Sequence, residues 1–143
     1  MAIQQVLTDM EKDMEFLAVT GVEDKLQNNV QLTIESLKSA GIQVWMLTGD
    51  KIETATSIAI SAGLKSRRHL LFFMRELTDR IMINTHLKDF ATKSLQSVLI
   101  IDGKTIDAIL NFEDSLNMFF KVAINAPCVC VCRCSPTQKA LIC

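Results

Sequence analysis

The sequence predicts an α/β fold, in which helices cover both faces of a mostly parallel sheet. Short apolar runs of strand length alternate with segments of helical spacing along the chain. This alternation is typical of parallel sheets, whose strands are buried on both sides. The chain has 143 residues, 49% of them apolar, which suits a packed core in a single domain.

The first half of the chain begins with helical spacing over residues 2–14. Residues 16–20, Phe-Leu-Ala-Val-Thr, form a short apolar run that ends at Gly21, as a buried strand would. A helix that stops at Gly41 follows, and its apolar face is made by Val30, Ile34 and Leu37. Residues 42–47 are a second expected strand. The next helix has a face of small residues that suits close packing on a sheet, made by Ile52, Ala55, Ala59 and Ala62.

The second half continues the alternation. Further strands are expected at residues 70–74, 97–101 and 128–132. Helices are expected at residues 78–91, 104–110 and 113–124. A last helix opens at Ser135-Pro136, because proline is favoured in the first helical turn. That helix has barely begun where the sequence stops, so we expect a piece of a longer protein, with a sheet that is incomplete at both ends.

Charge and hydropathy exclude several classes of partner. The net charge is −1 and the sequence has no basic tract, which argues against nucleic acid or an anionic membrane surface as the main partner. No run approaches the roughly 20 apolar residues of a membrane helix, and the acidic N-terminus does not resemble a signal peptide. We therefore expect a cytosolic, reducing location, where the five cysteines are thiols.

Polar and charged residues follow four of the expected strands. These strand-end loops are Gly21 to Asp24, Thr48 to Asp50, Asp102 to Thr105, and Arg133 to Lys139. Because the carboxyl ends of parallel strands meet at one edge of a sheet, we expect the four loops to converge there. Together they supply hydroxyl, carboxylate, guanidinium and ammonium groups, which are suited to holding phosphate.

The loop Thr48-Gly49-Asp50 is the first candidate for a phosphate contact. The Thr48 hydroxyl can donate to a phosphoryl oxygen, and Gly49 lets an anion approach an unshielded backbone N–H. The following helix presents the positive end of its dipole to the same place. Asp50 and Glu53 also fit a helix capping box, and spacing alone favours this as the main role of Asp50. The two roles are compatible.

Arg133 and Lys139 are the second candidates. Arg133 follows the end of a buried strand and Lys139 lies one turn into the next helix, so both can point back over the strand ends. A lysine there can neutralise charge on a transferring phosphoryl group. The alternative is a solvated lysine on a first helical turn, which spacing alone favours.

Three other patterns receive structural interpretations. Asp102-Gly103-Lys104-Thr105 resembles the end of a P-loop, but Val98 stands where that motif needs glycine, so a turn and a helix start explain the segment. Alternate cysteines from Cys128 to Cys134 would stand roughly 6–7 Å apart along a strand, which suits core packing better than a zinc site. His69 and His86 are interpreted as surface or ordinary packing residues.

Four strings carry a resemblance to a known family: TGVEDKLQNNV, AGIQVWMLTGDKIETATSIA, SVLIIDGKTIDAIL and VCRCSPTQKA. In this order they resemble the phosphorylation domain of P-type ATPases. Glu-Asp-Lys-Leu-Gln together with Trp-Met-Leu-Thr-Gly-Asp-Lys points to the lipid-flippase branch, and the Asp-Pro-Pro-Arg string of the ion pumps is absent. The resemblance covers nearly the whole chain, is vaguer at residues 64–95, and is closest to flippases related to the yeast endosomal and Golgi type.

The resemblance implies a haloacid-dehalogenase-like, three-layer Rossmann fold and a cycle that transfers the γ-phosphate of ATP to an aspartate. By motif, Thr48 and Gly49 would bind the phosphoryl group and Asp50 the nucleotide. Arg133 would contact the ribose or phosphates, and Lys139 would stabilise the transferring phosphoryl group. Asp24 would lie at the same edge, next to the residues that touch the ligand. The full-length enzyme would use ATP and Mg²⁺ and would move a phospholipid, with or without an accessory subunit. It would lie in the Golgi, endosomal or plasma membrane.

The departures from the family pattern concern the reacting groups. The acceptor string Asp-Lys-Thr-Gly-Thr and the Mg²⁺-holding string Gly-Asp-Gly-x-Asn-Asp do not occur in this sequence. The nucleotide-binding domain and membrane helices of the family are not present either. Residues 1–143 therefore resemble a partial phosphorylation domain, for which we expect no ATPase activity, weak nucleotide affinity and no tightly bound cofactor.

Two other functions stay open at this point. The chain can be a stand-alone phosphate- or nucleotide-binding α/β module with regulatory duties, or a thiol-rich protein that binds a metal. The first requires the strand-end loops to converge, and the second requires cysteine sulfurs that are accessible and suitably spaced.

Overall fold

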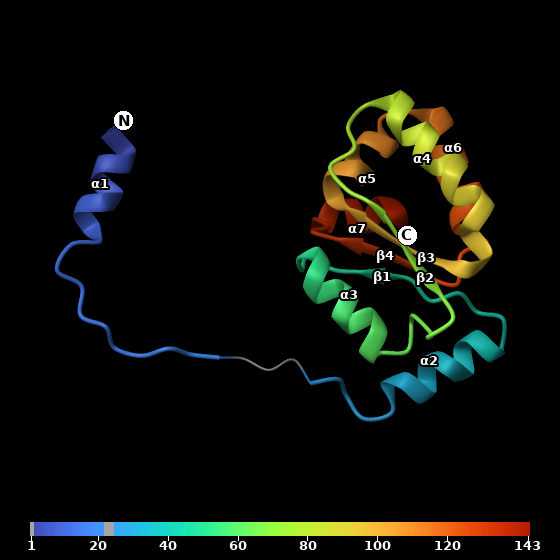
Figure 1. Ribbon diagram of the computed structural model, residues 1–143, viewed down its shortest axis with the longest axis horizontal. Coiled ribbons are helices and arrows are strands. Elements are labelled where there is room, and N and C mark those ends of the chain that lie inside the picture. The colour runs from blue at the N-terminus through green and yellow to red at the C-terminus, as the bar shows by residue number, and fades with distance from the viewer. Residues whose placement is uncertain (1, 22–24) are drawn as a thin grey trace.

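A four-stranded parallel sheet forms the centre of the computed structural model, which describes residues 2–21 and 25–143 (Figure 1). The strand order is β1-β4-β3-β2. The strands are β1 (Met46–Leu47), β2 (Leu70–Met74), β3 (Ser97–Asp102) and β4 (Val129–Cys132). Every neighbouring pair is parallel, which confirms the predicted α/β class.

Side chains of the two central strands alternate between two apolar clusters. Leu99 and Ile101 of β3 join Val129 and Val131 of β4 in the first cluster. The residues between them face the second cluster, and these are Val98, Ile100, Cys130 and Cys132. All residues of β3 and β4 are buried, because both faces of the sheet are covered.

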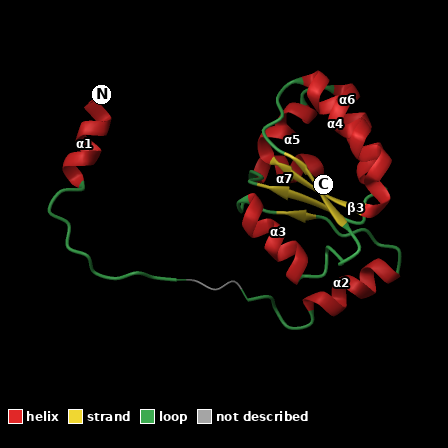
Figure 2. Ribbon diagram, viewed as in Figure 1, coloured by secondary structure: helices red, strands yellow, loops and turns green. Residues whose placement is uncertain are grey.

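The helices form two layers, one on each face of the sheet (Figure 2). The first cluster is covered by α4 (Arg80–Lys93), α5 (Gly103–Leu110) and α6 (Glu113–Ala123). The second is covered by α3 (Ile52–Ser61), with partly buried residues of α2 (Val30–Ser39) against it. A 3-10 turn, Ser94–Gln96, precedes β3, and the last helix, α7 (Pro136–Ile142), follows β4. The predicted three-layer arrangement is confirmed.

The face of α3 that meets the sheet consists of small residues, as the sequence predicts. Ala55 and Ala59 are completely buried, and Ala62 just after the helix is 4% exposed. Their small side chains let the helix lie close to the cysteine-rich face of β4. A larger side chain at these positions has no free space to enter.

The predicted strand at residues 16–20 is wrong. These residues follow α1 (Ala2–Met10) as coil, and the exposed fractions of Phe16, Leu17 and Val19 are 78%, 85% and 84%. Figure 1 shows the segment running apart from the sheet. A strand requires a neighbour for its backbone groups, and this segment pairs with neither edge of the described sheet. Gly21 therefore does not lie at the expected edge, and Asp24 lies outside the described residues.

The strand expected at residues 42–47 is shorter than its apolar run. Only Met46 and Leu47 pair with a neighbour, in register with Cys130 and Val131 of β4. As the outermost strand on its side, β1 has one neighbour, and residues 44–47 are only half-buried. Trp45, the single tryptophan, packs edge-on against Phe119 with ring centroids 6.2 Å apart.

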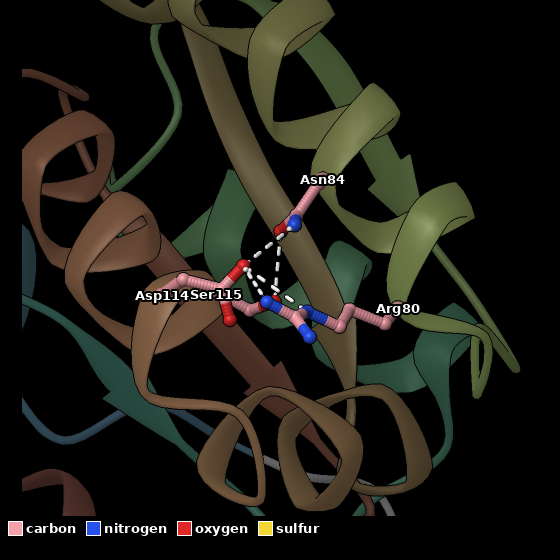
Figure 3. Close-up of polar contacts among 4 residues, drawn as sticks. All are labelled: Arg80, Asn84, Asp114 and Ser115. Carbon is pink, nitrogen blue, oxygen red and sulfur yellow. Dashed lines mark hydrogen bonds and ion pairs between the residues drawn. The ribbon is translucent and has the colours of Figure 1, made fainter.

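A polar junction joins α4 to the start of α6 (Figure 3). The Arg80 guanidinium lies 2.8 Å from the Asp114 carboxylate, which also accepts a hydrogen bond from the Asn84 amide at 3.1 Å. The Ser115 hydroxyl donates to the Asn84 side-chain oxygen at 2.8 Å. The four side chains join the first turns of the two helices. No helix in the described residues is long and apolar enough to cross a membrane.

Replacing Ala59 by leucine tests the close approach of α3 to the sheet. We expect Ala59→Leu to lower the free energy of unfolding by about 1–3 kcal/mol, because the added carbons force the helix away from β4. Urea denaturation followed by Trp45 fluorescence measures the change. Ile60→Leu is the matched control, because Ile60 is 51% exposed on the same helix. Equal midpoints for the two variants would contradict the packing described here.

The junction at Asp114 predicts a dependence of stability on pH. The hydrogen bond from Arg80, followed by that from Asn84 and the Arg80 charge, holds the pKa of Asp114 below its ordinary value of 3.8. The stabilising effect is thus complete above that value and is lost as the pH falls through the lowered folded-state pKa. We expect Asp114→Asn to lower the urea midpoint at neutral pH. We also expect the urea midpoint of this variant to fall less than that of the wild type as the pH is lowered. Asp89→Asn, which removes the ion pair with Lys93 within α4, is the control.

Candidate functional site

The loop Thr48–Asp50 is hydrogen-bonded to the segment that follows β4. The Thr48 N–H donates to the Val131 carbonyl, and the Cys134 N–H donates to the Thr48 carbonyl, both at 2.9 Å. The Arg133 N–H donates to the Asp50 carbonyl, also at 2.9 Å. The parallel pairing of β1 with β4 thus continues past both strands and brings two of the four expected strand-end loops together.

The side chains of Thr48 and Asp50 close the loop on itself. The Thr48 hydroxyl donates to the Asp50 carboxylate at 2.6 Å and accepts from the Asp50 N–H at 3.1 Å. The predicted capping box of Asp50 with Glu53 is wrong. Because α3 begins only at Ile52, its N-cap is Lys51, which makes no side-chain cap bond. Gly49 is exposed, and a Cβ atom there would meet nothing within 4 Å, so the space beside this residue is open.

Arg133 has a backbone conformation that is uncommon for a residue with a side chain. Its φ angle is +50°, and Glu76, which follows β2 by two residues, has a φ of +53°. Left-handed non-glycine residues are strained and persist only where their surroundings hold them. Such residues are concentrated at functional sites, and both of these lie at the carboxyl edge of the sheet.

Lys139 lies in the first turns of α7, which starts with the proline predicted from the sequence. The Ser135 hydroxyl accepts from the Gln138 N–H, and the Gln138 side chain accepts from the Ser135 N–H, so the helix has a complete capping box. Burial raises the pKa of the Cys134 thiol, and the nearby Lys139 charge opposes that effect. Among the described residues no hydrogen bond joins the Lys139 side chain to Thr48, and its charge acts on the Cys134 thiol at the end of β4.

Asp102 organises the remaining strand-end loop, a role that sequence reasoning missed. Its carboxylate is 5% exposed and accepts from the Glu76 N–H and the Thr105 N–H, both at 2.8 Å. The Thr105 hydroxyl accepts from the Leu77 N–H at 3.0 Å. These bonds tie the end of β2 to the start of α5 and confirm the turn and helix start expected here. Asp-x-x-Thr at the end of an apolar run is the signal for this helix cap.

A cavity of about 240 Å³ lies beside the loop at the same edge of the sheet. It is lined by Ile52, Glu53, Arg75, Glu76, Asp102 and Arg133. Arg75 follows β2 directly, and its guanidinium lies 4.9 Å from the centre of the Phe73 ring. Guanidinium groups here can donate to phosphate oxygens, and free carboxylates can accept from hydroxyl groups. Of these residues the sequence placed Asp102 and Arg133 at this edge, and it missed Arg75 and Glu76 because the carboxyl end of β2 carries no recognisable motif.

The described residues do not form the Mg²⁺ site that the resemblance implies for the full-length enzyme. No three histidine, cysteine, aspartate or glutamate side chains among them are grouped closely enough to hold a metal. Both oxygens of the Asp102 carboxylate already accept backbone N–H groups, and the Asp50 carboxylate accepts the Thr48 hydroxyl.

The cysteines of β4 are core residues, as predicted. Cys128, Cys130, Cys132 and Cys134 are buried free thiols, whereas Cys143 is exposed. Burial, with the Asp102, Glu53 and Asp50 charges, raises the pKa of Cys132 to about 11. His69 and His86 have ordinary local roles, since each ring makes one hydrogen bond to a nearby backbone group.

Alkylation distinguishes core cysteines from accessible, metal-binding ones. We expect iodoacetamide at mildly alkaline pH to modify Cys143 alone in the folded chain, because the other four thiols are buried and Cys132 is held in its unreactive protonated form. Mass spectrometry counts the added groups, and urea-unfolded protein, where all five thiols react, is the control. Rapid modification of Cys130 or Cys132 without unfolding would contradict this packing.

Comparison with curated proteins finds relatives over almost the whole chain, although no family model matches. The chain is 45% identical over 131 residues, 92% of its length, to "Phospholipid-transporting ATPase neo1" of Schizosaccharomyces pombe. It is 43% identical over 140 residues, 98% of its length, to "Probable phospholipid-transporting ATPase IIB" of Homo sapiens. It is also 36% identical over an alignment of 152 residues to "Phospholipid-transporting ATPase 1" of Arabidopsis thaliana.

The chain spans 12% of the length of each of these relatives. The match to the human protein includes both Thr48–Asp50 and Arg133–Lys139, because it covers 98% of the chain. The parallel sheet with helices on both faces agrees with the Rossmann-like fold that the motifs imply. Over almost its whole length the chain is therefore similar to one segment of the phospholipid-transporting ATPases.

Proposed function

We propose that residues 1–143 are part of the phosphorylation domain of an ATP-driven, phospholipid-translocating P-type ATPase. The observation that carries this proposal is the pairing of Thr48–Asp50 with residues 131–134, which places a hydroxyl, an exposed glycine and a guanidinium-bearing residue at one edge of a parallel sheet. Ligands of such sheets bind beyond the carboxyl ends of the strands. The names of the relatives supply the reaction, ATP hydrolysis coupled to phospholipid transport.

In this proposal the loop changes partners when it binds a phosphoryl group. At rest the Thr48 hydroxyl donates to Asp50, so it must rotate away to donate to a phosphoryl oxygen. The Gly49 N–H and the N-terminus of the ten-residue α3 act on the same oxygens. The rotation frees the Asp50 carboxylate to accept from the nucleotide. Thr48 thus exchanges an internal hydrogen bond for one to the ligand.

Arg133 and Lys139 supply positive charge in this proposal. The Arg133 side chain borders the cavity and contacts the ribose or the phosphates of ATP. Lys139 lies in α7 and stabilises the transferring phosphoryl group once the rest of the site is assembled. Asp24, which the resemblance places at the same edge, supports the site from the segment before α2.

The aspartyl-phosphate intermediate would form on a residue of the full-length protein, since the acceptor string is absent from these 143 residues. Mg²⁺ would neutralise phosphate charge there and be held by residues outside this chain. The isolated chain would bind ATP weakly and would not hydrolyse it. The parent enzyme would be a hydrolase and translocase with this domain on the cytosolic side of a Golgi, endosomal or plasma membrane, with or without an accessory subunit.

Titration with ATP tests the proposed site. We expect ATP to shift the backbone amide signals of Gly49, Asp50 and Arg133 in the nuclear magnetic resonance spectrum of the isotope-labelled chain. Arg133→Ala should weaken binding roughly 10-fold, the value of one charge-assisted hydrogen bond. Lys104→Ala is the matched control, because that exposed cation at the same edge has Glu76 as its ion-pair partner. Shifts confined to other surfaces, or equal affinities for both variants, would refute the assignment.

Phosphate release from ATP by the purified chain tests the proposal that the isolated chain does not hydrolyse ATP. We expect none above the buffer background, with or without Mg²⁺, because no acceptor aspartate motif is present. Mg²⁺-dependent turnover that Thr48→Val abolishes would instead show a complete active site and would favour a stand-alone nucleotide-binding enzyme or module.

A further inference from the structure

We propose that Gly103 and Gln138 are positioning residues that hold Arg133 in its left-handed conformation over the cavity. The inference rests on the function proposed above for Arg133 and adds two residues that touch no ligand. Gly103 belongs to α5 and Gln138 to α7, two helices next to β4. Both residues contact the turn in which Arg133 lies.

Gly103 leaves the space that the Arg133 backbone occupies. A Cβ atom on Gly103 would lie 2.4 Å from the Arg133 carbonyl oxygen and 3.2 Å from its carbonyl carbon. These are backbone atoms, so they cannot move aside as a flexible side chain does. The start of α5 and the turn after β4 can approach this closely only because residue 103 has no side chain.

Gln138 ties the same turn to α5 from the other side. Its side chain is buried, and its amide nitrogen donates to the Gly103 carbonyl at 2.8 Å and to the Asp107 carboxylate at 2.5 Å. Its amide oxygen accepts from the Ser135 N–H at 2.7 Å. One side chain therefore uses its donor and acceptor groups to fix the first turn of α7 against the start of α5.

Arg133 is held between these contacts and the loop Thr48–Asp50. Its N–H donates to the Asp50 carbonyl, its carbonyl group faces Gly103, and its φ angle of +50° is strained. If the turn were free to relax, φ would become negative, and the direction of the side chain would change with it. Gly103 and Gln138 thus act on a ligand through the orientation of Arg133.

Hydrogen exchange tests the positioning without any ligand. We expect Gly103→Ala and Gln138→Leu to raise the exchange rates of the Arg133 and Cys134 amides at least about 10-fold, because the bonds to Asp50 and Thr48 open more often. Gly21→Ala is the matched glycine control, since a Cβ atom there meets nothing within 4 Å. Thr137→Ala is the control for the exposed side of α7. Unchanged exchange at residues 133 and 134 in both variants overturns the proposal.

A double-mutant cycle with ATP separates positioning from a merely structural role. Gly103→Ala should weaken ATP binding roughly 10-fold in the wild-type chain and have no further effect in the Arg133→Ala background. Equal losses in the two backgrounds overturn the proposal. If Gly103→Ala does not fold, Gln138→Glu takes its place, because it keeps the acceptor for Ser135 and loses the donor to Gly103. If ATP binding does not depend on Arg133 at all, the proposed function fails, and hydrogen exchange alone decides the positioning.

Discussion

The burial of β4 between β1 and β3 is the constraint on which the rest of the structure depends. Its backbone is paired on both sides, and its side chains enter both apolar clusters. The pairing with β1 continues into the two loops, so Thr48, Asp50 and Arg133 are placed by backbone hydrogen bonds rather than by contacts between side chains. Main-chain bonds of this kind fix loop geometry independently of what the exposed side chains do.

Burial also explains the composition of β4. A strand covered on both faces needs small or branched apolar side chains, and its sequence Val-Cys-Val-Cys places cysteines on the face that meets the alanines of α3. Cys128 and Cys130 lie with their sulfurs 3.7 Å apart inside this layer. The thiols fill a space that is too small for larger side chains. The close packing of α3 on β4 also brings the N-terminus of α3 to the loop at Thr48.

Two of the four non-glycine residues with a positive φ among the described residues lie where strands end. Arg133 and Glu76 both have left-handed backbones, and both are held by groups of the segment from Asp102 to Thr105. The sequence of this segment resembles part of a nucleotide-binding motif, but its physical role is different. The Asp102 carboxylate and the Thr105 hydroxyl accept hydrogen bonds from the segment after β2, and Gly103 leaves space for the turn after β4. The cavity between Arg75, Glu53 and Arg133 is the consequence of that junction.

The sequence by itself determined the order of helices and strands, the parallel sheet and the core role of the cysteines, because periodicity and apolar runs report burial directly. It predicted Thr48, Asp50 and Arg133 as candidate site residues through local motifs. It did not determine that residues 16–20 form no strand, that Asp50 bonds to Thr48 rather than capping α3, or that Arg75 and Glu76 border the site. Only the tertiary structure decided these points, because each depends on a partner distant in sequence or on a turn whose dihedral angles are set by its neighbours.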